Sequence, residues 1–268
     1  MIAALWPLWT FAAFAVVTMV LVWAWQRRTR NAGAVDVAWA LMLGIAALYF
    51  GWIGDGDMRG RVLIATMGGL WGFRLGLHLC ARVLSEPEDG RYAYLRAHWQ
   101  GDQLKFFAFF LFQAGLTVLF ALPFLAVAQN PVAPSLGAIV AAVGLWLLSA
   151  LGETLADRQL ARFRADPGNR GRTCRAGLWR YSRHPNYFFE WLHWFAYVIL
   201  ALGSPLFWFS AAGPLVMFLS LRYVTGIPFV EAQSLRSRGD DYRAYQRQTN
   251  AFFPWWPRTR AIDANDRQ

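Results

Sequence analysis

The sequence predicts an all-α, multi-pass integral membrane protein. Hydrophobic residues make up 57% of the 268-residue chain and charged residues only 16%, a balance that a soluble domain of this size does not normally have. The apolar residues gather into runs of about 20, the length at which a helix crosses the hydrocarbon core of a bilayer. Arginine is concentrated in alternate connections between these runs, as expected of a membrane protein with a fixed orientation.

Seven apolar runs follow one another along the chain, and we expect one transmembrane helix from each. The first is expected to be an anchor and not a signal peptide, because Arg27, Arg28 and Arg30 follow it and no basic region precedes it. We expect a single domain over 1–268. The runs lie at 3–25, 35–53, 61–84, 106–128, 132–155, 187–203 and 205–225.

Charge placement predicts the orientation of these helices. The connection at 156–185 holds eight arginines against two aspartates. The three connections that alternate with the arginine-rich ones, "GDGDMRGR", "AQNPVAP" and "GSP", together contain only two basic residues, Arg59 and Arg61. The positive-inside rule then places the N-terminus outside and the C-terminus in the cytoplasm. The net charge of +10 follows from this topology, so we expect no nucleic-acid partner.

Ionisable residues within apolar runs are costly in a membrane, so they are candidates for a functional site. Their spacing places them in pairs on single helix faces, because residues three or four apart are neighbours on a helix. Most lie toward the predicted cytoplasmic side. These residues are Asp36, Arg74 with His78, Glu153 with Asp157, and Glu190 with His193.

Several classes of site are disfavoured by the sequence. Glu190 and His193 form one Glu-x-x-His unit, but a second unit of the kind paired in di-iron bundles is absent, and the chain has only four histidines. We therefore expect no metal site. The two cysteines have no metal spacing, and the sequence contains no nucleophile elbow, P-loop or Rossmann fingerprint.

The stretch "GLWRYSRHPNYFFE" resembles the segment of the steroid 5-alpha-reductase superfamily in which a glycine-leucine turn leads to Asn-Tyr-x-x-Glu. Four further segments are similar to the bacterial branch of this superfamily, a group of integral membrane reductases of the domain of unknown function 1295 type. These segments are "VDVAWAL", "LWGFRLGLHL", "EPEDGRYAYLRAHW" and "YRAYQRQTNAFFPWWP". The resemblance covers nearly the whole chain. It implies an NADPH-dependent reductase of a bacterial inner membrane, with its cofactor site facing the cytoplasm.

The resemblance also implies roles for particular residues. Arginines can grip the phosphates of NADPH bidentately, and the Asn-Tyr-x-x-Glu element would contact the nicotinamide or its ribose. The cofactor-binding candidates are Arg74, Glu153, Asp157, Arg158, Arg164, Arg172, Arg183, His184, Asn186, Tyr187, Glu190, Arg222, Tyr242 and Tyr245.

The implied chemistry is hydride transfer to a conjugated carbon-carbon double bond while a polar group activates the ketone oxygen. Asp36 takes the place of a glutamate in the steroid enzymes and is expected to be an acid kept neutral by burial. Trp71 stands where those enzymes have a tyrosine, and Tyr92 or Tyr94 can substitute for it. The expected substrate is an apolar enone, steroid-like or isoprenoid, that enters from the bilayer, and the expected state is a monomer in contact with membrane lipids.

Two other functions remain open on sequence grounds. The segment "RHPNY" within "GLWRYSRHPNYFFE" also resembles the Arg-His-Pro-x-Tyr element of isoprenylcysteine carboxyl methyltransferases, in which Arg, His and a downstream Glu help to hold S-adenosylmethionine. A non-enzymatic subunit that binds lipid or quinone would account for the 15 tryptophans, many of which suit an interface belt.

Overall fold

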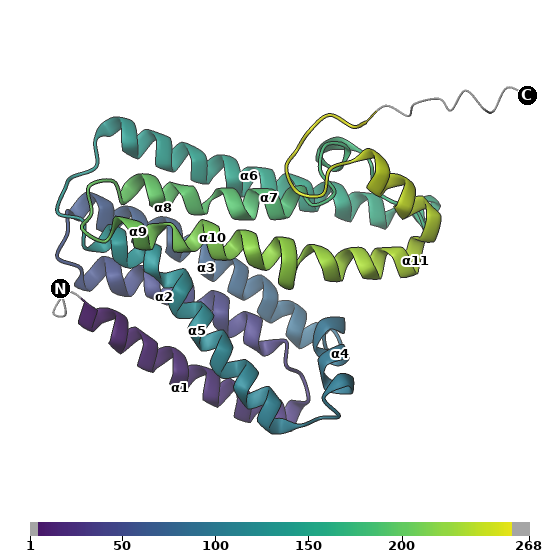
Figure 1. Ribbon diagram of the computed structural model, residues 1–268, viewed down its shortest axis with the longest axis horizontal. Helices are drawn as coiled ribbons and strands as arrows, with labels where there is room; N and C mark the ends of the chain where they lie inside the picture. Colours follow the sequence, from purple (N-terminus) through teal and green to yellow (C-terminus); the bar gives the residue numbers. More distant parts are fainter. Residues whose placement is uncertain (1–4, 259–268) are drawn as a thin grey trace, which may run out of the picture. The chain divides into compact units, whose positions relative to one another are not determined.

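The structure is a computed structural model that describes residues 5–258, and within this range the chain is helical and has no strand (Figure 1). The all-α fold class is confirmed. The helices in order are α1 (Trp6–Thr29), α2 (Ala34–Ile53), α3 (Met58–Ser85), α4 (Gly90–His98), α5 (Gln103–Ala128), α6 (Leu136–Ala165), η2 (Pro167–Asn169), η3 (Gly177–Arg180), α7 (Pro185–Leu192), α8 (Trp194–Leu200), α9 (Phe207–Ser210), α10 (Ala212–Leu219), η4 (Ser220–Val224) and α11 (Ile227–Gln248).

Six helical segments in the described part of the chain are long and apolar enough to cross a membrane. They correspond to six of the seven apolar runs, and the last of them, Phe207–Gln248, continues from α9 through α11. The run at 187–203 forms two shorter helices instead. α7 begins at Pro185 and ends before a turn at His193, after which α8 begins. The orientation of the helices in the membrane stays a prediction.

Contacts divide the chain into two compact units. The first contains the described part of Met1–Ala142 together with Phe195–Val216, and the second contains Val143–Trp194 together with the described part of Met217–Gln268. Each unit has a polar cluster of its own, so the two are described separately.

In the first unit, α1, α2, α3 and α5 pack against one another (Figure 1). Their apolar faces bury large side chains, among them Phe50 of α2 and Phe124 of α5. The ring of Phe124 meets Tyr197 of α8 edge-on, with centroids 4.9 Å apart. The amide of Asn130 donates to the carbonyl oxygens of Leu200 and Leu202, at 3.1 and 2.9 Å, so the segment after α8 is tied to the end of α5.

α2 and α3 approach each other closely through glycine. A Cβ atom added at Gly72 of α3 would lie 2.5 Å from the backbone nitrogen of Gly44 and 2.9 Å from the carbonyl oxygen of Ala40. These are backbone atoms of α2 and cannot rotate away. Small residues at helix crossings allow membrane helices to pack by van der Waals contact between backbones.

We expect Gly72→Ala to lower the stability of the protein by about 1–3 kcal/mol, because the added methyl group forces two packed helices apart. The measurement is thermal unfolding of the purified protein in detergent. Gly115→Ala in α5 is the matched control, since an added Cβ there meets nothing within 4 Å and alanine is the better helix former. Equal melting temperatures for Gly72→Ala and Gly115→Ala would contradict this account of the crossing.

In the second unit, α6, α7 and α11 are joined by the loop that carries η2 and η3. The indole nitrogen of Trp179 donates to the carbonyl oxygen of Ala156 at 2.9 Å, which fixes η3 against α6. α11 is bent at Gly239, where φ is 52° and ψ is −121°. This backbone conformation is essentially restricted to glycine, and it divides α11 into two straight parts.

Candidate functional site

The polar cluster of the first unit centres on Asp36 at the start of α2. Arg91 NH2 donates to Asp36 Oδ2 at 2.9 Å, and the Tyr92 hydroxyl donates to Asp36 Oδ1 at 2.7 Å. Both donors come from α4, more than 50 residues later in the chain. Burial raises the pKa of Tyr92 well above its usual value, and the charge of Asp36 raises it further, so the phenol keeps its proton.

A second carboxylate attaches α4 to the surrounding helices. Glu88 accepts hydrogen bonds from Arg96 at 2.7 and 3.0 Å and from the backbone nitrogen of Ala32 at 2.7 Å. Arg96 also reaches Gln26 of α1 at 3.4 Å, and Gln26 donates to Gln103 of α5 at 2.9 Å. The α4 segment is therefore fixed against the ends of α1, α2 and α5.

The role of Asp36 as a neutral acid stays a prediction, and its two hydrogen bonds set the conditions under which it could act. Each of its carboxylate oxygens accepts a hydrogen bond, and an ionised carboxylate cannot donate one, so Asp36 could donate to a substrate oxygen only in its protonated form. Trp71 packs edge-on against Trp39, with ring centroids 5.9 Å apart, and Tyr94 is 60% exposed. The structure thus joins Asp36 to Tyr92 and gives Trp71 an aromatic packing contact.

The polar cluster of the second unit centres on Glu231 of α11. Its Oε1 accepts from Arg183 Nε at 2.6 Å, and its Oε2 accepts from the Gln246 amide at 2.8 Å. His184 Nε2 and the Tyr242 hydroxyl lie 3.2 and 3.4 Å from Oε1. One carboxylate therefore holds the loop before α7 to both parts of α11.

Arg183 makes further contacts with the backbone. Its NH1 donates to the carbonyl oxygens of Gln246 and Thr249 at 3.1 and 2.6 Å. The guanidinium of Arg183 is thus engaged by the protein itself through Nε and NH1, and the phosphate-binding role implied by the resemblance stays a prediction.

The imidazole of His184 is buried. Burial lowers its pKa below the usual range, while the hydrogen bond to Glu231 opposes this effect. The ring stacks on Tyr187, with centroids 5.4 Å apart and an interplanar angle of 9°. In the neutral ring, the Nε2 hydrogen can be donated to Glu231, so His184 acts as a hydrogen-bond donor at neutral pH.

Other predicted residues lie around this cluster in the second unit. Asn186 donates to Asp157 of α6 at 3.1 Å, which connects the start of α7 to α6. The Tyr245 hydroxyl donates to the carbonyl oxygens of Trp179 and Ser182 and so holds the backbone of η3. Arg222 lies over the ring of Tyr223 at 5.1 Å.

The second unit also contains an open cavity of about 440 Å³, a size typical of sites for small molecules. Four arginines and one carboxylate, Asp166, line it. The arginines come from three places: Arg164 from α6, Arg170 and Arg172 from the loop after η2, and Arg238 from α11.

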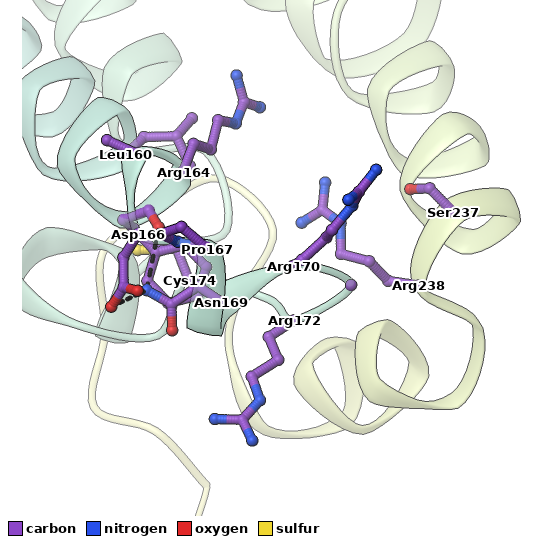
Figure 2. Close-up of a pocket in the computed structure, with 13 residues that line it drawn as sticks. Leu160, Arg164, Asp166, Pro167, Asn169, Arg170, Arg172, Cys174, Ser237 and Arg238 are labelled. Carbon is purple, nitrogen blue, oxygen red and sulfur yellow. Dashed lines mark hydrogen bonds between the residues drawn. The ribbon is translucent and has the colours of Figure 1, made fainter.

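Figure 2 shows how these side chains are arranged: Arg164 enters from α6, Arg170 and Arg238 from the opposite side, and Arg172 extends away from the other three. Arg164 and Arg238 are close enough to repel each other electrostatically. The carboxylate of Asp166 accepts from the backbone nitrogen of Gly168 at 2.9 Å and so caps its own loop. The cavity is therefore strongly positive, and a bound anion would relieve the repulsion.

The loop that carries Arg170 and Arg172 is anchored by Asp241, which follows the bend at Gly239. Asp241 accepts from the backbone nitrogen of Thr173 at 2.7 Å and from Arg175 at 2.6 Å. Cys174 is buried in the same wall of the cavity, and burial raises the pKa of its thiol. The thiol therefore stays protonated at neutral pH and is a poor nucleophile.

The structure brings together only part of the predicted phosphate-binding set. Arg164 and Arg172 line the cavity, whereas Arg158 does not; Arg74 belongs to α3 in the other unit. Of the remaining candidates, Glu153 lies on the face of α6 that also carries Asp157 and Arg164, and Glu190 lies in α7. Sequence analysis did not single out Arg170 or Arg238.

Glu231 was also missed. It lies 48 residues after Arg183 in a polar helix, where spacing gives no sign of the contact. The one available signal was the downstream glutamate that accompanies Arg-His-Pro-x-Tyr in the methyltransferase resemblance.

The model of one family, described as Protein of unknown function (DUF1295), matches residues 22–249. The chain belongs to this family. DUF1295 is linked to the steroid 5-alpha-reductase-like membrane superfamily, and its match includes both polar clusters and all four cavity arginines. No curated protein and no solved structure matches the chain.

The lowered pKa of His184 predicts a pH dependence of stability. The ring takes up a proton near pH 6.5 in the unfolded chain and only at lower pH in the folded one. The unfolded state therefore binds more protons below about pH 6.5, and stability falls as the pH falls. We expect the melting temperature of the wild type to decrease from pH 7 to pH 5 more steeply than that of His184→Gln, and parallel pH profiles would show that His184 makes no contribution.

Proposed function

We propose that this protein is an NADPH-dependent membrane reductase that reduces a conjugated carbon-carbon double bond of an apolar enone, steroid-like or isoprenoid. The observation that carries the proposal is the positive cavity of the second unit. Membership of DUF1295, with its link to steroid 5-alpha-reductase-like proteins, also supports it.

The residues of the cavity fit a phosphorylated ligand. The lining includes four arginines and one carboxylate, and that carboxylate already accepts hydrogen bonds from its own loop. Guanidinium groups match phosphate oxygens in geometry and charge, and they form stronger hydrogen bonds to phosphate than neutral donors do. The 2′-phosphate and pyrophosphate of NADPH are ligands of this kind.

The face of α6 connects the cavity to the start of α7. Asp157, Leu160 and Arg164 are spaced by three and four residues, so they follow one side of the helix over about 10 Å. Arg164 and Leu160 line the cavity, and Asp157 accepts from Asn186. We assign the phosphates to the arginines and the nicotinamide ribose to Asn186, Tyr187 and Glu190.

When bound, NADPH supplies a hydride. Within the first unit taken by itself, the group best suited to donate a hydrogen bond to a ketone oxygen is Tyr92, with Asp36 and Arg91 as its positioning residues. The hydroxyl hydrogen of Tyr92 can rotate from Asp36 to another acceptor, and the phenol is protonated at neutral pH because burial raises its pKa. The proposed substrate enters from the bilayer, and the cofactor side faces the cytoplasm of a bacterial inner membrane.

The affinity for two nucleotides tests the cofactor assignment. We expect the purified full-length protein to bind NADPH at least about ten times more tightly than NADH, because only NADPH carries the 2′-phosphate. Arg170→Ala is expected to remove most of this difference. Binding is measured by isothermal calorimetry and by the shift in melting temperature.

Arg162→Ala is the matched control, because Arg162 is an exposed arginine of α6 that does not line the cavity. It removes the same charge and should leave the preference for NADPH intact. Equal affinities for NADPH and NADH in the wild type, or equal effects of Arg170→Ala and Arg162→Ala, would contradict the cofactor assignment.

A second candidate function is methyl transfer from S-adenosylmethionine, favoured by the contact of Arg183 and His184 with Glu231. In the methyltransferases that the motif resembles, Arg, His and a downstream Glu help to hold this cofactor. S-adenosylmethionine has a carboxylate and an ammonium group but no phosphate, so it makes little use of the cavity arginines. Stabilisation by S-adenosylmethionine that Glu231→Gln abolishes, without stabilisation by NADPH, would favour this function over the reductase.

A further inference from the structure

The chain after α11 forms an exposed aromatic segment. We call residues 252–258, "FFPWWPR", the aromatic strap. Phe252 is buried, but Phe253, Trp255 and Trp256 are 52%, 69% and 68% exposed. Three large aromatic side chains so exposed within four residues are unusual on a surface that faces water, and they mark a surface that contacts another partner.

The strap is held in place by the fold. The Ser182 hydroxyl donates to the carbonyl oxygen of Phe252 at 2.9 Å, and the Trp255 backbone nitrogen donates to the carbonyl oxygen of Tyr181 at 2.9 Å. The Arg258 nitrogen donates to the carbonyl oxygen of Gln248 at 2.9 Å. The ring of Trp256 packs edge-on against Tyr181 at 5.3 Å. The exposed rings are therefore presented in fixed positions.

The strap returns to the end of an apolar helix. Figure 1 shows the chain after α11 turning back, and Phe252 and Phe253 contact Phe218 of α10, with centroids 5.3 and 6.1 Å apart. Phe218 lies near the end of the apolar part of Phe207–Gln248, and the polar α11 begins soon after it. The strap thus lies at the depth where an apolar segment changes to a polar one.

The charges within the strap and in the ten residues before it are all positive. From 242 to 258 the sequence has three arginines and no aspartate or glutamate. Arg258 ends the strap, and exposed Arg180 precedes Tyr181, which contacts both Trp255 and Trp256. Tryptophan and tyrosine favour the interface between bilayer and water, and arginine beside them favours anionic headgroups.

We propose that the aromatic strap is an interfacial anchor that places Trp255 and Trp256 in the headgroup region of a leaflet rich in anionic phospholipid. Arg180 and Arg258 pair with the lipid phosphates. Because the carbonyl oxygen of Phe252 accepts a hydrogen bond from Ser182, and the backbone nitrogen of Arg183 donates to the carbonyl oxygen of Asn250 at 2.8 Å, this anchor also sets the depth of the loop before α7. The assignment is independent of the catalysed reaction.

The depth of the two tryptophans is measured by fluorescence of the full-length protein in nanodiscs of phosphatidylcholine and phosphatidylglycerol. The signal of Trp255 and Trp256 is the difference between the wild type and Trp255→Phe/Trp256→Phe, a variant that keeps the rings aromatic. We expect lipids brominated near the headgroup end of the acyl chain to reduce this difference signal by at least half, and aqueous iodide to leave it nearly unchanged. Quenching by iodide and not by brominated lipid would overturn the proposal and show that the rings face water, and quenching by neither would overturn it and show that protein covers them.

The preference for anionic lipid is measured with single charge changes. We expect phosphatidylglycerol to raise the melting temperature of the wild type above its value in pure phosphatidylcholine, and Arg258→Gln to reduce this gain by about half or more. Arg243→Gln is the control: it removes the same charge from an exposed arginine of α11 that is paired with Asp240 at 2.7 Å. An equal loss in both variants would indicate a general charge effect, and no loss in Arg258→Gln would overturn the role of this arginine.

Discussion

The carboxylate of Glu231 is the constraint on which the organisation of the second unit depends. It is only 15% exposed, and its closest ion pair is with Arg183, which is 12% exposed. Breaking a buried ion pair by removing one partner costs about 3–5 kcal/mol, because the remaining charge is left without compensation. Here the same carboxylate also meets His184, Tyr242 and Gln246, so one group holds the loop before α7 to α11 at several points.

The arginines of the predicted cytoplasmic region are of two kinds, those paired with a carboxylate of the protein and those that line the cavity. Arg183 has a buried carboxylate and two backbone carbonyl oxygens as partners, so it connects the loop before α7 to α11 and to Thr249. In the first unit, Arg91 and Arg96 are engaged in the same way by Asp36 and Glu88. Arg164, Arg170 and Arg238 face a cavity with one capped carboxylate, and this imbalance of charge makes them suited to bind an anion.

The apolar runs were predictable from sequence because membrane helices need a length and a composition that local patterns display. The division of the run at 187–203 into α7 and α8 was not predicted. Pro185 marks only the start of α7 and not its end. Within α6, periodicity correctly placed Glu153 and Asp157 on one face, and the same face continues to Arg164. Resemblance and charge placed Arg164 and Arg172 in a phosphate site, and the structure puts both of them at the cavity.

Contacts between distant segments were not predictable. Asp36 meets Arg91 and Tyr92 of α4, and a helical pattern carries no information on a partner more than 50 residues away. For the same reason, the shared position of Arg170 and Arg238 at the cavity was not predictable, because it depends on the contact between the loop after η2 and Asp241 of α11. These are tertiary effects, and they determine which of many arginines line the cavity.

The central claim is that an anionic cofactor binds among the cavity arginines and not at the Arg183–Glu231 pair. Hydrogen exchange followed by mass spectrometry, with and without NADPH, tests this most directly because it reports on each backbone segment. The account predicts slower exchange in 164–174 and 234–241 when NADPH is present, together with slower exchange at 186–190, where the nicotinamide ribose is assigned. Protection confined to 183–190 and the residues around Glu231, with no change in 164–174, would contradict it.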